Sequence, residues 1–194
     1  GWGRTIRQDF GTSSGSPGSR ITALGEGADG QLYYTTALGG AFDSGTVTRM
    51  QKDGSGLQIL RSFSESGSAA ITPREGVVVG TDGFLYGTTS HGGINNRGTV
   101  YRIRADGSGY GVLRVLGQTP GDAASPVGGV IQASDGLLYG TASAGGTHGR
   151  GALFRVAPDA GGYALIYSFR GTPADGAVPT TKLLEASDGF LYGT

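Results

Sequence analysis

Apolar residues occur along the chain in short blocks that are separated by polar, glycine-rich segments. In the clearest region these blocks cover residues 76–80, 84–89, 98–104 and 110–116. They are rich in Val, Leu, Tyr and Thr, which are residues that strands favour. No block has the three- and four-residue apolar spacing of an amphipathic helix. The pattern therefore predicts four short β-strands and no helix.

The polar segments between these blocks predict how the strands connect. Asp82-Gly83 separates the first two blocks, and Asp106-Gly107 separates the last two. An Asp-Gly pair between two apolar runs is a strong signal for a tight antiparallel hairpin. The segment Ser90–Arg97 is longer and predicts a loop. The region is thus predicted to be a four-stranded antiparallel meander.

The same pattern returns every 53 residues. DGFLYGT at residues 82–88 is repeated without change at 188–194, and close copies stand at 29–35 and 135–141. The same shift carries Pro73 onto Pro126 and Pro179. A fixed period of about 50 residues is typical of solenoids, propellers and arrays.

These observations predict an all-β fold of the β-propeller class, in which each four-stranded antiparallel meander is one blade. Phe84, Tyr86 and Leu113, with their equivalents, are expected to fill the space between blades. A β-helix would not need antiparallel hairpins, and a sandwich would not repeat its strands in register. The predicted single repeat domain spans residues 1–194, with blades at about 20–63, 73–116, 126–169 and, in part, 179–194, and with residues 1–10 as the last strand of a preceding blade.

This division gives about 3.7 blades, whereas closed propellers have roughly four to eight. A last sheet with two strands leaves an edge open to pairing with another chain. We expect a longer natural protein, with completion of the ring by oligomerisation as the alternative. The sequence does not fix the number of blades or the oligomeric state.

Composition narrows the class of protein. The chain has 40 glycines in 194 residues, but their periodic spacing argues against a disordered segment. Its formal net charge is zero, which argues against nucleic acid as a partner. No apolar run is long enough for membrane insertion as a helix. The absence of cysteine excludes disulfides and thiolate chemistry.

The repeat resembles the GloVer family, also called the Gloeo/Verruco tandem repeat. The resemblance rests on Asp82-Gly83, on residues 85–89, on Gly92-Gly93, on 98–100 and on Asp106-Gly107. It implies a bacterial protein that is extracellular or at the cell surface, with the periplasm as the alternative, and it brings no known activity. The departures from the family pattern are Tyr34 in place of the strand glycine, Ala152 in place of Thr, and Asp159-Ala160 in place of the second Asp-Gly.

The longer loops are expected to lie together on one face and to carry any site. The candidate ligand-binding residues in them are His91, Asn95, Asn96, Arg97, His148 and Arg150. The arginines could bind carboxylates or sulfated sugars, or could instead bond a neighbouring blade. The asparagines fit left-handed turns, and the histidines fit solvated loop positions. Asp122 and Asp175 are expected to cap the turn between blades.

No catalytic residue, metal site or cofactor is predicted. The Asp-Gly pairs lack the further carboxylates of a calcium loop, and no phosphate-binding motif is present. We therefore expect an exported, noncatalytic binding or structural module whose partner is a protein or a polysaccharide at the cell surface. Two alternatives remain: a lyase or hydrolase that acts on glycans in the central funnel, and a subunit of a filament or larger assembly that forms through open blade edges.

Overall fold

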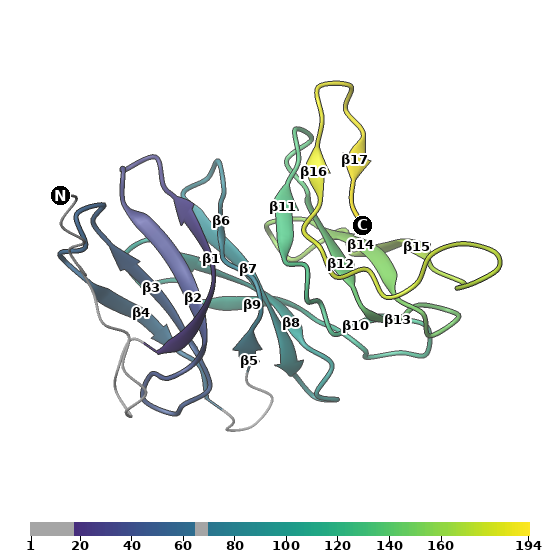
Figure 1. The fold of residues 1–194 in the computed structure, drawn as a ribbon, viewed down its shortest axis with the longest axis horizontal. Coiled ribbons are helices and arrows are strands. Elements are labelled where there is room, and N and C mark those ends of the chain that lie inside the picture. The colour runs from purple at the N-terminus through teal and green to yellow at the C-terminus, as the bar shows by residue number, and fades with distance from the viewer. Residues whose placement is uncertain (1–17, 65–69) are drawn as a thin grey trace, which may run out of the picture.

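The computed structural model describes residues 18–64 and 70–194, and every regular element in these ranges is a β-strand (Figure 1). Three antiparallel sheets lie side by side in chain order, and a two-stranded hairpin follows them. The prediction of an all-β chain with four-stranded antiparallel sheets is therefore confirmed. The strand predicted in residues 1–10 lies outside the described residues.

Each sheet corresponds to one 53-residue repeat. The first sheet contains β1 (Ser19–Glu26), β2 (Leu32–Leu38), β3 (Thr46–Met50) and β4 (Gln58–Ser62). The second sheet contains β5 (Ala70–Pro73), β6 (Val78–Val79), β7 (Phe84–Gly92), β8 (Thr99–Arg104) and β9 (Gly111–Val115). The third sheet contains β11 (Val130–Gln132), β12 (Leu138–Ala142), β14 (Ala152–Val156) and β15 (Ala164–Ser168). The short strands β10 (Ala123–Ala124) and β13 (Ala144–Gly145) form a separate pair beside the third sheet, and β16 (Leu184–Glu185) with β17 (Leu191–Tyr192) forms the hairpin.

In the first two repeats, strand structure begins earlier than the sequence analysis predicts. Both β5 and β6 pair with β7, so part of the predicted linker before residue 76 is strand. Pro73 has no N–H to give to a sheet, and it stands where the pairing of β5 ends. In the first sheet Arg20 occupies the equivalent position, and β1 runs through it as one strand with a register shift.

The repeated DGxLY segment forms the same turn in all four copies. The aspartate Oδ1 accepts a hydrogen bond from the backbone N–H two residues later, and Oδ2 accepts one from the tyrosine hydroxyl four residues later. The glycine has a positive φ, which glycine adopts without a steric penalty. The Asp–Tyr pairs, with their oxygen–oxygen distances, are Asp29–Tyr33 at 2.7 Å, Asp82–Tyr86 at 2.5 Å, Asp135–Tyr139 at 2.6 Å and Asp188–Tyr192 at 2.8 Å.

The turn between the third and fourth strands is also retained in every described repeat. Asp53, Asp106 and Asp159 each accept a hydrogen bond from the backbone N–H two residues later. The residue after the third of these aspartates is Ala160, which adopts a φ of 73° where the other repeats have glycine. The departure from Asp-Gly therefore leaves the turn in place but puts a Cβ in the left-handed region.

The residue opposite the strand glycine explains why the first repeat can have Tyr34 in place of that glycine. Gly87 pairs with Tyr101, and a Cβ on Gly87 would lie 2.4 Å from the Tyr101 hydroxyl oxygen. In the first sheet the pair is reversed, because buried Tyr34 stands opposite Thr48. One aromatic ring and one small residue therefore share this place in each sheet.

The hydrophobic core lies between neighbouring sheets, as the sequence analysis expects. The cluster between the first and second sheets contains Tyr33, Val47, Phe63, Leu85, Tyr101 and Ile103. The cluster between the second and third sheets contains Tyr86, Val100, Leu113, Leu116, Leu138 and Phe154. Because each sheet buries its faces against the next one, no single repeat holds a complete core.

Backbone contacts join each repeat to the following one. The glycine just before the third strand packs against the proline of the next repeat, and a Cβ on Gly98 would lie 2.7 Å from Pro126 Cδ. Beside this contact, the N–H of Ser125 donates to the carbonyl of Arg97 at 2.7 Å. Equivalent bonds run from Thr72 to Ser44 at 3.1 Å and from Val178 to Arg150 at 2.8 Å.

The last threonine of the repeated heptapeptide makes a further link between repeats. Thr35 and Thr141 donate from their hydroxyls to the carbonyls of Glu75 and Thr181, at 2.8 and 3.0 Å. Thr88 reaches the carbonyl of Pro126 at 3.3 Å. The heptapeptide is thus repeated because its aspartate and tyrosine close a turn and its threonine binds the next repeat.

Candidate functional site

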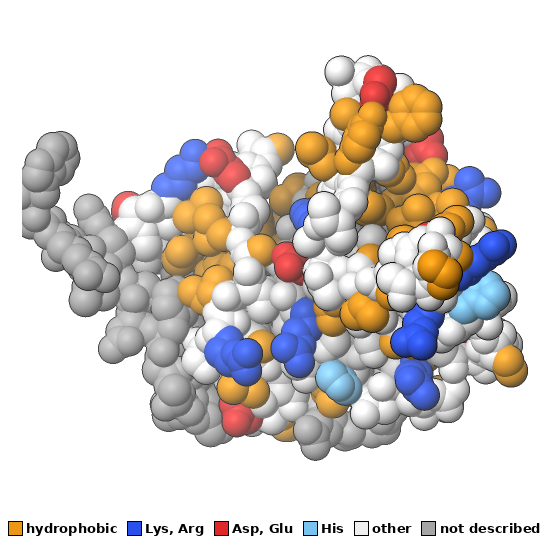
Figure 2. Space-filling view, turned by 45° about the vertical axis from the view of Figure 1, so that its right-hand side comes forward, with side chains coloured by type: hydrophobic (Ala, Val, Ile, Leu, Met, Phe, Trp, Pro, Cys, Tyr) orange, Lys and Arg blue, Asp and Glu red, His pale blue; other side chains and the backbone are white. Residues whose placement is uncertain are grey.

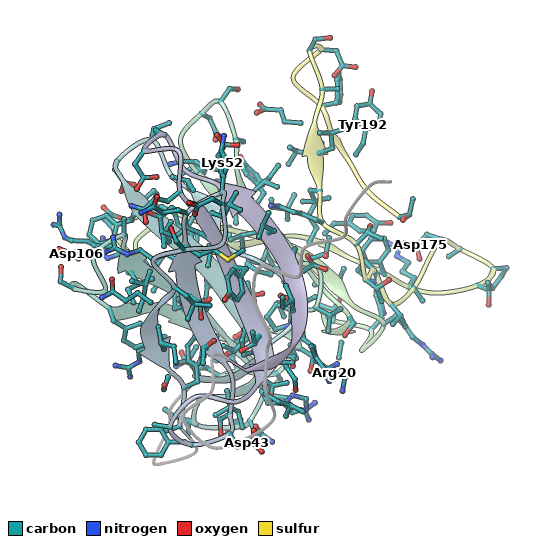
Figure 3. The ribbon with its side chains drawn as sticks, turned by 60° about the vertical axis from the view of Figure 1, so that its left-hand side comes forward. Arg20, Asp43, Lys52, Asp106, Asp175 and Tyr192 are labelled. Carbon is teal, nitrogen blue, oxygen red and sulfur yellow. The ribbon has the colours of Figure 1, made fainter. Side chains whose placement is uncertain are left out.

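The antiparallel sheets give the molecule two different ends. The tight Asp-Gly turns lie at one end, here named the turn end. The longer connections between the second and third strands and between repeats lie at the other, here named the loop end. In Figure 3, Arg20 and Asp43 lie at the loop end, and Lys52 and Tyr192 lie at the opposite end.

Charge is divided unevenly between these ends. Of the described residues, the turn end carries nine carboxylates and five basic side chains, whereas the loop end carries seven arginines and three carboxylates. The loop-end arginines are Arg20, Arg61, Arg74, Arg97, Arg114, Arg150 and Arg170, and the loop-end carboxylates are Asp43, Asp122 and Asp175. Figure 2 shows basic side chains and histidine gathered along the lower part of one face. The neutral total therefore conceals two ends of opposite charge.

Several arginine side chains contact residues of a neighbouring sheet. Arg49 and Arg102 donate to the carbonyls of Ala105 and Pro158 in the following repeat, at 3.1 and 2.9 Å. The Arg61 guanidinium lies 4.1 Å from the ring centre of Tyr110. These residues make the inter-sheet bonds that the sequence analysis offers as an alternative for Arg97 and Arg150.

Arg97 and Arg150 have no such partner in the part of the chain that the structure describes. Both are exposed, and only their backbone carbonyls bond the next repeat. The stem of Arg97 lies over Gly117, where an added Cβ would come within 2.5 Å of it. The stem of Arg150 lies over Gly171 in the same way, at 3.6 Å. Each arginine is thus held along its stem while its guanidinium stays available.

A shallow pocket adjoins each of these arginines. The pocket at Arg97 has a volume of about 520 Å³ and is lined also by Gln118, Thr119 and Asp122. The pocket at Arg150 has a volume of about 200 Å³ and is lined also by Arg170, Thr172 and Asp175. The arginine, threonine and aspartate of the two pockets are related by the 53-residue shift. The pockets are therefore copies of one site in successive repeats.

The two pocket aspartates hold the connection between repeats. Asp122 is buried and accepts hydrogen bonds from Arg114 at 2.9 Å, from two backbone N–H groups and from the Tyr163 hydroxyl. Asp175 accepts from the Tyr167 hydroxyl and from the N–H groups of Arg170 and Gly171. The bond from Tyr167 is the main cause of the lowered pKa of Asp175, so this group stays ionised at neutral pH.

The asparagines among the candidate residues are used by the fold. Asn96 has a φ of 52° and accepts a hydrogen bond from the N–H of Gly92 at 2.7 Å. Asp43 makes the same bond to Gly39 in the first repeat. Asn95 donates to the carbonyl of Gly117 at 2.8 Å and lines the Arg97 pocket. The turn interpretation is therefore the better one for Asn96, whereas Asn95 both supports and borders the pocket.

The histidines do not come together. His91 lies in β7 and not in the predicted loop, because the strand extends to residue 92, and its Nδ1 is 2.9 Å from the Ser90 hydroxyl. His148 is exposed in the loop before Arg150. Among the described residues, no group of three or more His, Asp or Glu side chains is arranged to hold a metal ion. In the same ranges, no helix has the length and apolar character to cross a membrane.

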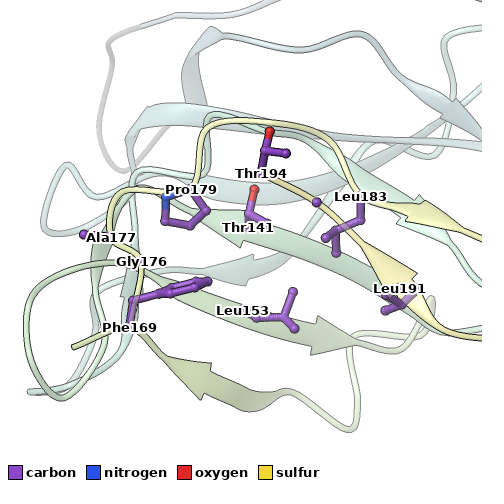
Figure 4. A pocket seen from close by; sticks show the side chains of 10 residues that line it. Thr141, Leu153, Phe169, Gly176, Ala177, Pro179, Leu183, Leu191 and Thr194 are labelled. Carbon is purple, nitrogen blue, oxygen red and sulfur yellow. The ribbon is translucent and has the colours of Figure 1, made fainter. Parts of the chain in front are cut away.

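A different pocket, which is apolar, lies between the third sheet and the β16–β17 hairpin (Figure 4). It has a volume of about 360 Å³, and its side chains include Leu153, Phe169, Leu183 and Leu191. The pocket lies between the third sheet and the hairpin in the same way as the hydrophobic cores lie between the other sheets. It is therefore best understood as the next inter-sheet interface, with fewer strands to fill it.

One acid–base pair that joins two different repeats was not found by sequence analysis. Glu75 packs against Gly129 of the next repeat and interacts electrostatically with Lys182. Burial raises the pKa of Glu75, and burial lowers the pKa of Lys182, with each charge opposing the shift of the other. These residues occupy adjacent positions in two different repeats, which no local motif reveals.

Solved structures share this fold at low sequence identity. A chain from the crystal structure of a nidogen/laminin complex aligns with a TM-score of 0.59 and 16% identity over 84% of this chain. The extracellular domain of a protein described as a hybrid two-component system, from B. thetaiotaomicron, aligns with a TM-score of 0.63 and 12% identity over 97% of this chain. This chain spans 51% of the first protein and 22% of the second, and the likeness shows the fold alone.

Sequence comparisons agree with the repeat pattern. A search of curated proteins found no match to the chain. The model of the Gloeobacter/Verrucomicrobia repeat matches residues 5–194, which include every copy of the DGxLY turn. The suspected family is thereby confirmed: the chain belongs to the Gloeobacter/Verrucomicrobia repeat family.

Proposed function

We propose that this chain is part of an exported or cell-surface β-propeller that binds acidic macromolecules at its loop end without catalysing a reaction. Its sheets are the blades, and the contacts between consecutive sheets are the contacts between blades. The observation that carries the proposal is the set of exposed loop-end arginines whose guanidinium groups bond no described residue. An acidic protein or an acidic polysaccharide at the cell surface is the partner.

Two further features support binding over a purely structural role. The loop-end arginines Arg97 and Arg150 border pockets, whereas Arg49 and Arg102 are used in contacts between sheets. The excess of positive charge at the loop end attracts anionic partners to that end, while the turn end repels them. The extracellular setting rests on the family resemblance and on the second structural neighbour, which is an extracellular domain.

Two matched variants test this proposal. The loop-end variant replaces Arg20, Arg97 and Arg150 by serine, and the turn-end variant replaces Lys52, Arg104 and Arg155 by serine. Both lose three positive charges. We expect the loop-end variant to bind immobilised polyglutamate or polygalacturonate at least about tenfold more weakly than the unaltered protein. The turn-end variant should bind within about twofold.

The measurement is biolayer interferometry at low and physiological salt, with neutral dextran as the control surface. Circular dichroism melting curves check that both variants are folded. Equal losses in the two variants would show that binding follows total charge and not the loop end. No binding of the unaltered protein to either acidic polymer would remove the proposal.

Glu75 and Lys182 favour a second candidate, a lyase or hydrolase that acts on glycans. A carboxyl group with a raised pKa and an amine with a lowered pKa are suited to general acid–base catalysis. In this case the protein should generate new chain ends from a polysaccharide panel, and Glu75→Gln should abolish that activity. Activity that Glu75→Gln leaves unchanged, or no activity at all, would reject this candidate.

A further inference from the structure

The two arginine pockets form a repeated site, and the repetition itself indicates the kind of ligand. Arg97 and Arg150 occupy equivalent positions, as do Thr119 and Thr172. A ligand with one acidic group would gain nothing from a second copy of the pocket in the next repeat. A polymer with regularly spaced acidic groups can occupy both at once, and its second contact is then intramolecular.

The lining of the pockets favours a sugar polymer over an acidic peptide. Neither pocket is lined by an aromatic or large aliphatic side chain, which protein partners commonly use as binding anchors. Gln118, Thr119 and Thr172 instead offer amide and hydroxyl groups that suit sugar hydroxyls. The guanidinium can bind a carboxylate or sulfate through two parallel hydrogen bonds.

The aspartate of each pocket does not prevent anion binding. Both oxygens of Asp122 accept bonds, and one donor is the Arg114 guanidinium, which neutralises its charge. Asp175 is more exposed, but its pocket contains a second arginine, Arg170. Each pocket therefore keeps at least one arginine that is not needed to balance its own carboxylate.

We propose that the pockets at Arg97 and Arg150 bind successive acidic groups of one linear acidic polysaccharide. This inference rests on the proposed function and narrows its partner to one class. The shared chemistry is a sugar polymer that carries carboxylate or sulfate groups. Gly117 and Gly171 position the arginines by letting their stems lie across the turns.

The test uses the full chain, with polygalacturonate for the carboxylate group and dextran sulfate for the sulfate group. Arg97→Ala and Arg150→Ala should each weaken binding to the preferred polymer by about tenfold or more, and the double variant should bind at background level. Free galacturonate should compete at least about a hundredfold less well per acidic group, because it lacks the second contact. Arg97→Lys should behave nearly as Arg97→Ala, because lysine cannot form the paired bonds.

Arg155→Ala is the matched control, since Arg155 is an exposed turn-end arginine outside both pockets. We expect it to change affinity by less than about twofold. If Arg97→Ala and Arg150→Ala weaken binding no more than Arg155→Ala, or if free galacturonate competes as well as the polymer, the paired-pocket inference is wrong. Loop-end binding still stands in that case if the loop-end variant binds more weakly than the turn-end variant. Binding to polyglutamate but to neither polysaccharide would also show that the paired-pocket inference is wrong, while loop-end binding would stand. Failure of every acidic polymer to bind would overturn the proposed function as well.

Discussion

The first and second repeats fill the same position with opposite residues. In the first sheet the second strand provides the large residue, Tyr34, and the third strand provides Thr48. In the second sheet the second strand provides Gly87, and the third strand provides Tyr101. The third sheet follows the second, with Gly140 opposite Phe154. The repeats thus keep one aromatic and one small residue in this pair, and not the identity of the residue at either position.

Some parts of the repeat are fixed by local geometry, and others are set by packing between strands. The Asp-Gly turns are the same in every described copy, because each is completed by atoms within five residues. The strand positions vary, because a residue there can change if its cross-strand partner changes with it. Coupled substitutions should therefore be tolerated where single ones are not.

The largest loss of stability is expected when only one member of the Gly87–Tyr101 pair is replaced. Tyr101→Thr alone should lower the free energy of unfolding by about 3–5 kcal/mol, because it leaves a cavity in the core between the first two sheets. Gly87→Tyr alone should also be strongly destabilising, because its side chain meets the Tyr101 ring. The double variant copies the first repeat and should lose less than either single variant.

Urea unfolding followed by circular dichroism measures all three free energies and gives the coupling energy between the two positions. A strongly favourable coupling is expected. If the double variant loses as much stability as either single variant, the two arrangements are not interchangeable at this site.

The second-largest effect is on the pH dependence of stability, which should differ between the buried and the exposed copies of the Asp–Tyr turn. Burial first, and the bond to Asp29 second, raise the pKa of Tyr33 to about 12 from its ordinary value of 10.0. Burial also raises the pKa of Tyr86, whereas the bond to Asp188 is the main cause for exposed Tyr192. A raised folded-state pKa gives stability that is present below pH 10 and is lost as pH rises toward 12.

The melting temperature should therefore fall steeply above pH 10. We expect Tyr86→Phe to reduce the steepness of this fall, because one buried titration is removed, and Tyr192→Phe to change it much less. The measurement is the melting temperature between pH 9 and 11, with tyrosine ionisation followed by absorbance. Equal effects of the two substitutions would mean that burial does not control these pKa values.

A smaller effect is expected from a buried hydroxyl pair that only some repeats contain. The hydroxyls of Thr89 and Thr99 are 2.9 Å apart and fully buried, whereas the third sheet has Ala142 opposite Ala152. Thr89→Ala should cost about 1–3 kcal/mol, because it leaves the Thr99 hydroxyl without this partner. Adding Thr99→Ala should recover part of the loss. A double variant that is less stable than Thr89→Ala would contradict this account in urea unfolding experiments.

Sequence reasoning located the repeat, the strands and the tight turns, because all of these depend on residues close together in the chain. It placed Arg97 and Arg150 together in the longer loops, since equivalent positions in a repeat must share a location, and their role in binding a ligand stays a prediction. It did not find the role of Asn95, the pairing of β5 with β7, or the approach of Glu75 to Lys182. Each of these depends on which residue of another repeat or loop comes near, and a single repeat does not contain that information.

The smallest effect on stability, and the only expected gain, concerns the turn between the third and fourth strands. Gly54 and Gly107 have φ values of 86° and 89°, and Ala160 adopts 73° at the equivalent position. A Cβ in the left-handed region costs about 1–2 kcal/mol, and glycine loses about 0.5–1 kcal/mol more chain entropy on folding than alanine. Ala160→Gly should therefore raise the free energy of unfolding by about 0.5–1 kcal/mol.

The reverse change, Gly107→Ala, is the matched control and should destabilise the protein by at least a similar amount, because its Cβ would also lie 3.2 Å from the Leu60 carbonyl oxygen. Urea midpoints at constant slope give both values. A loss of stability in Ala160→Gly would show that the third repeat holds this turn by contacts of the alanine methyl group. The turn end would then vary between repeats in the same way as the strands do.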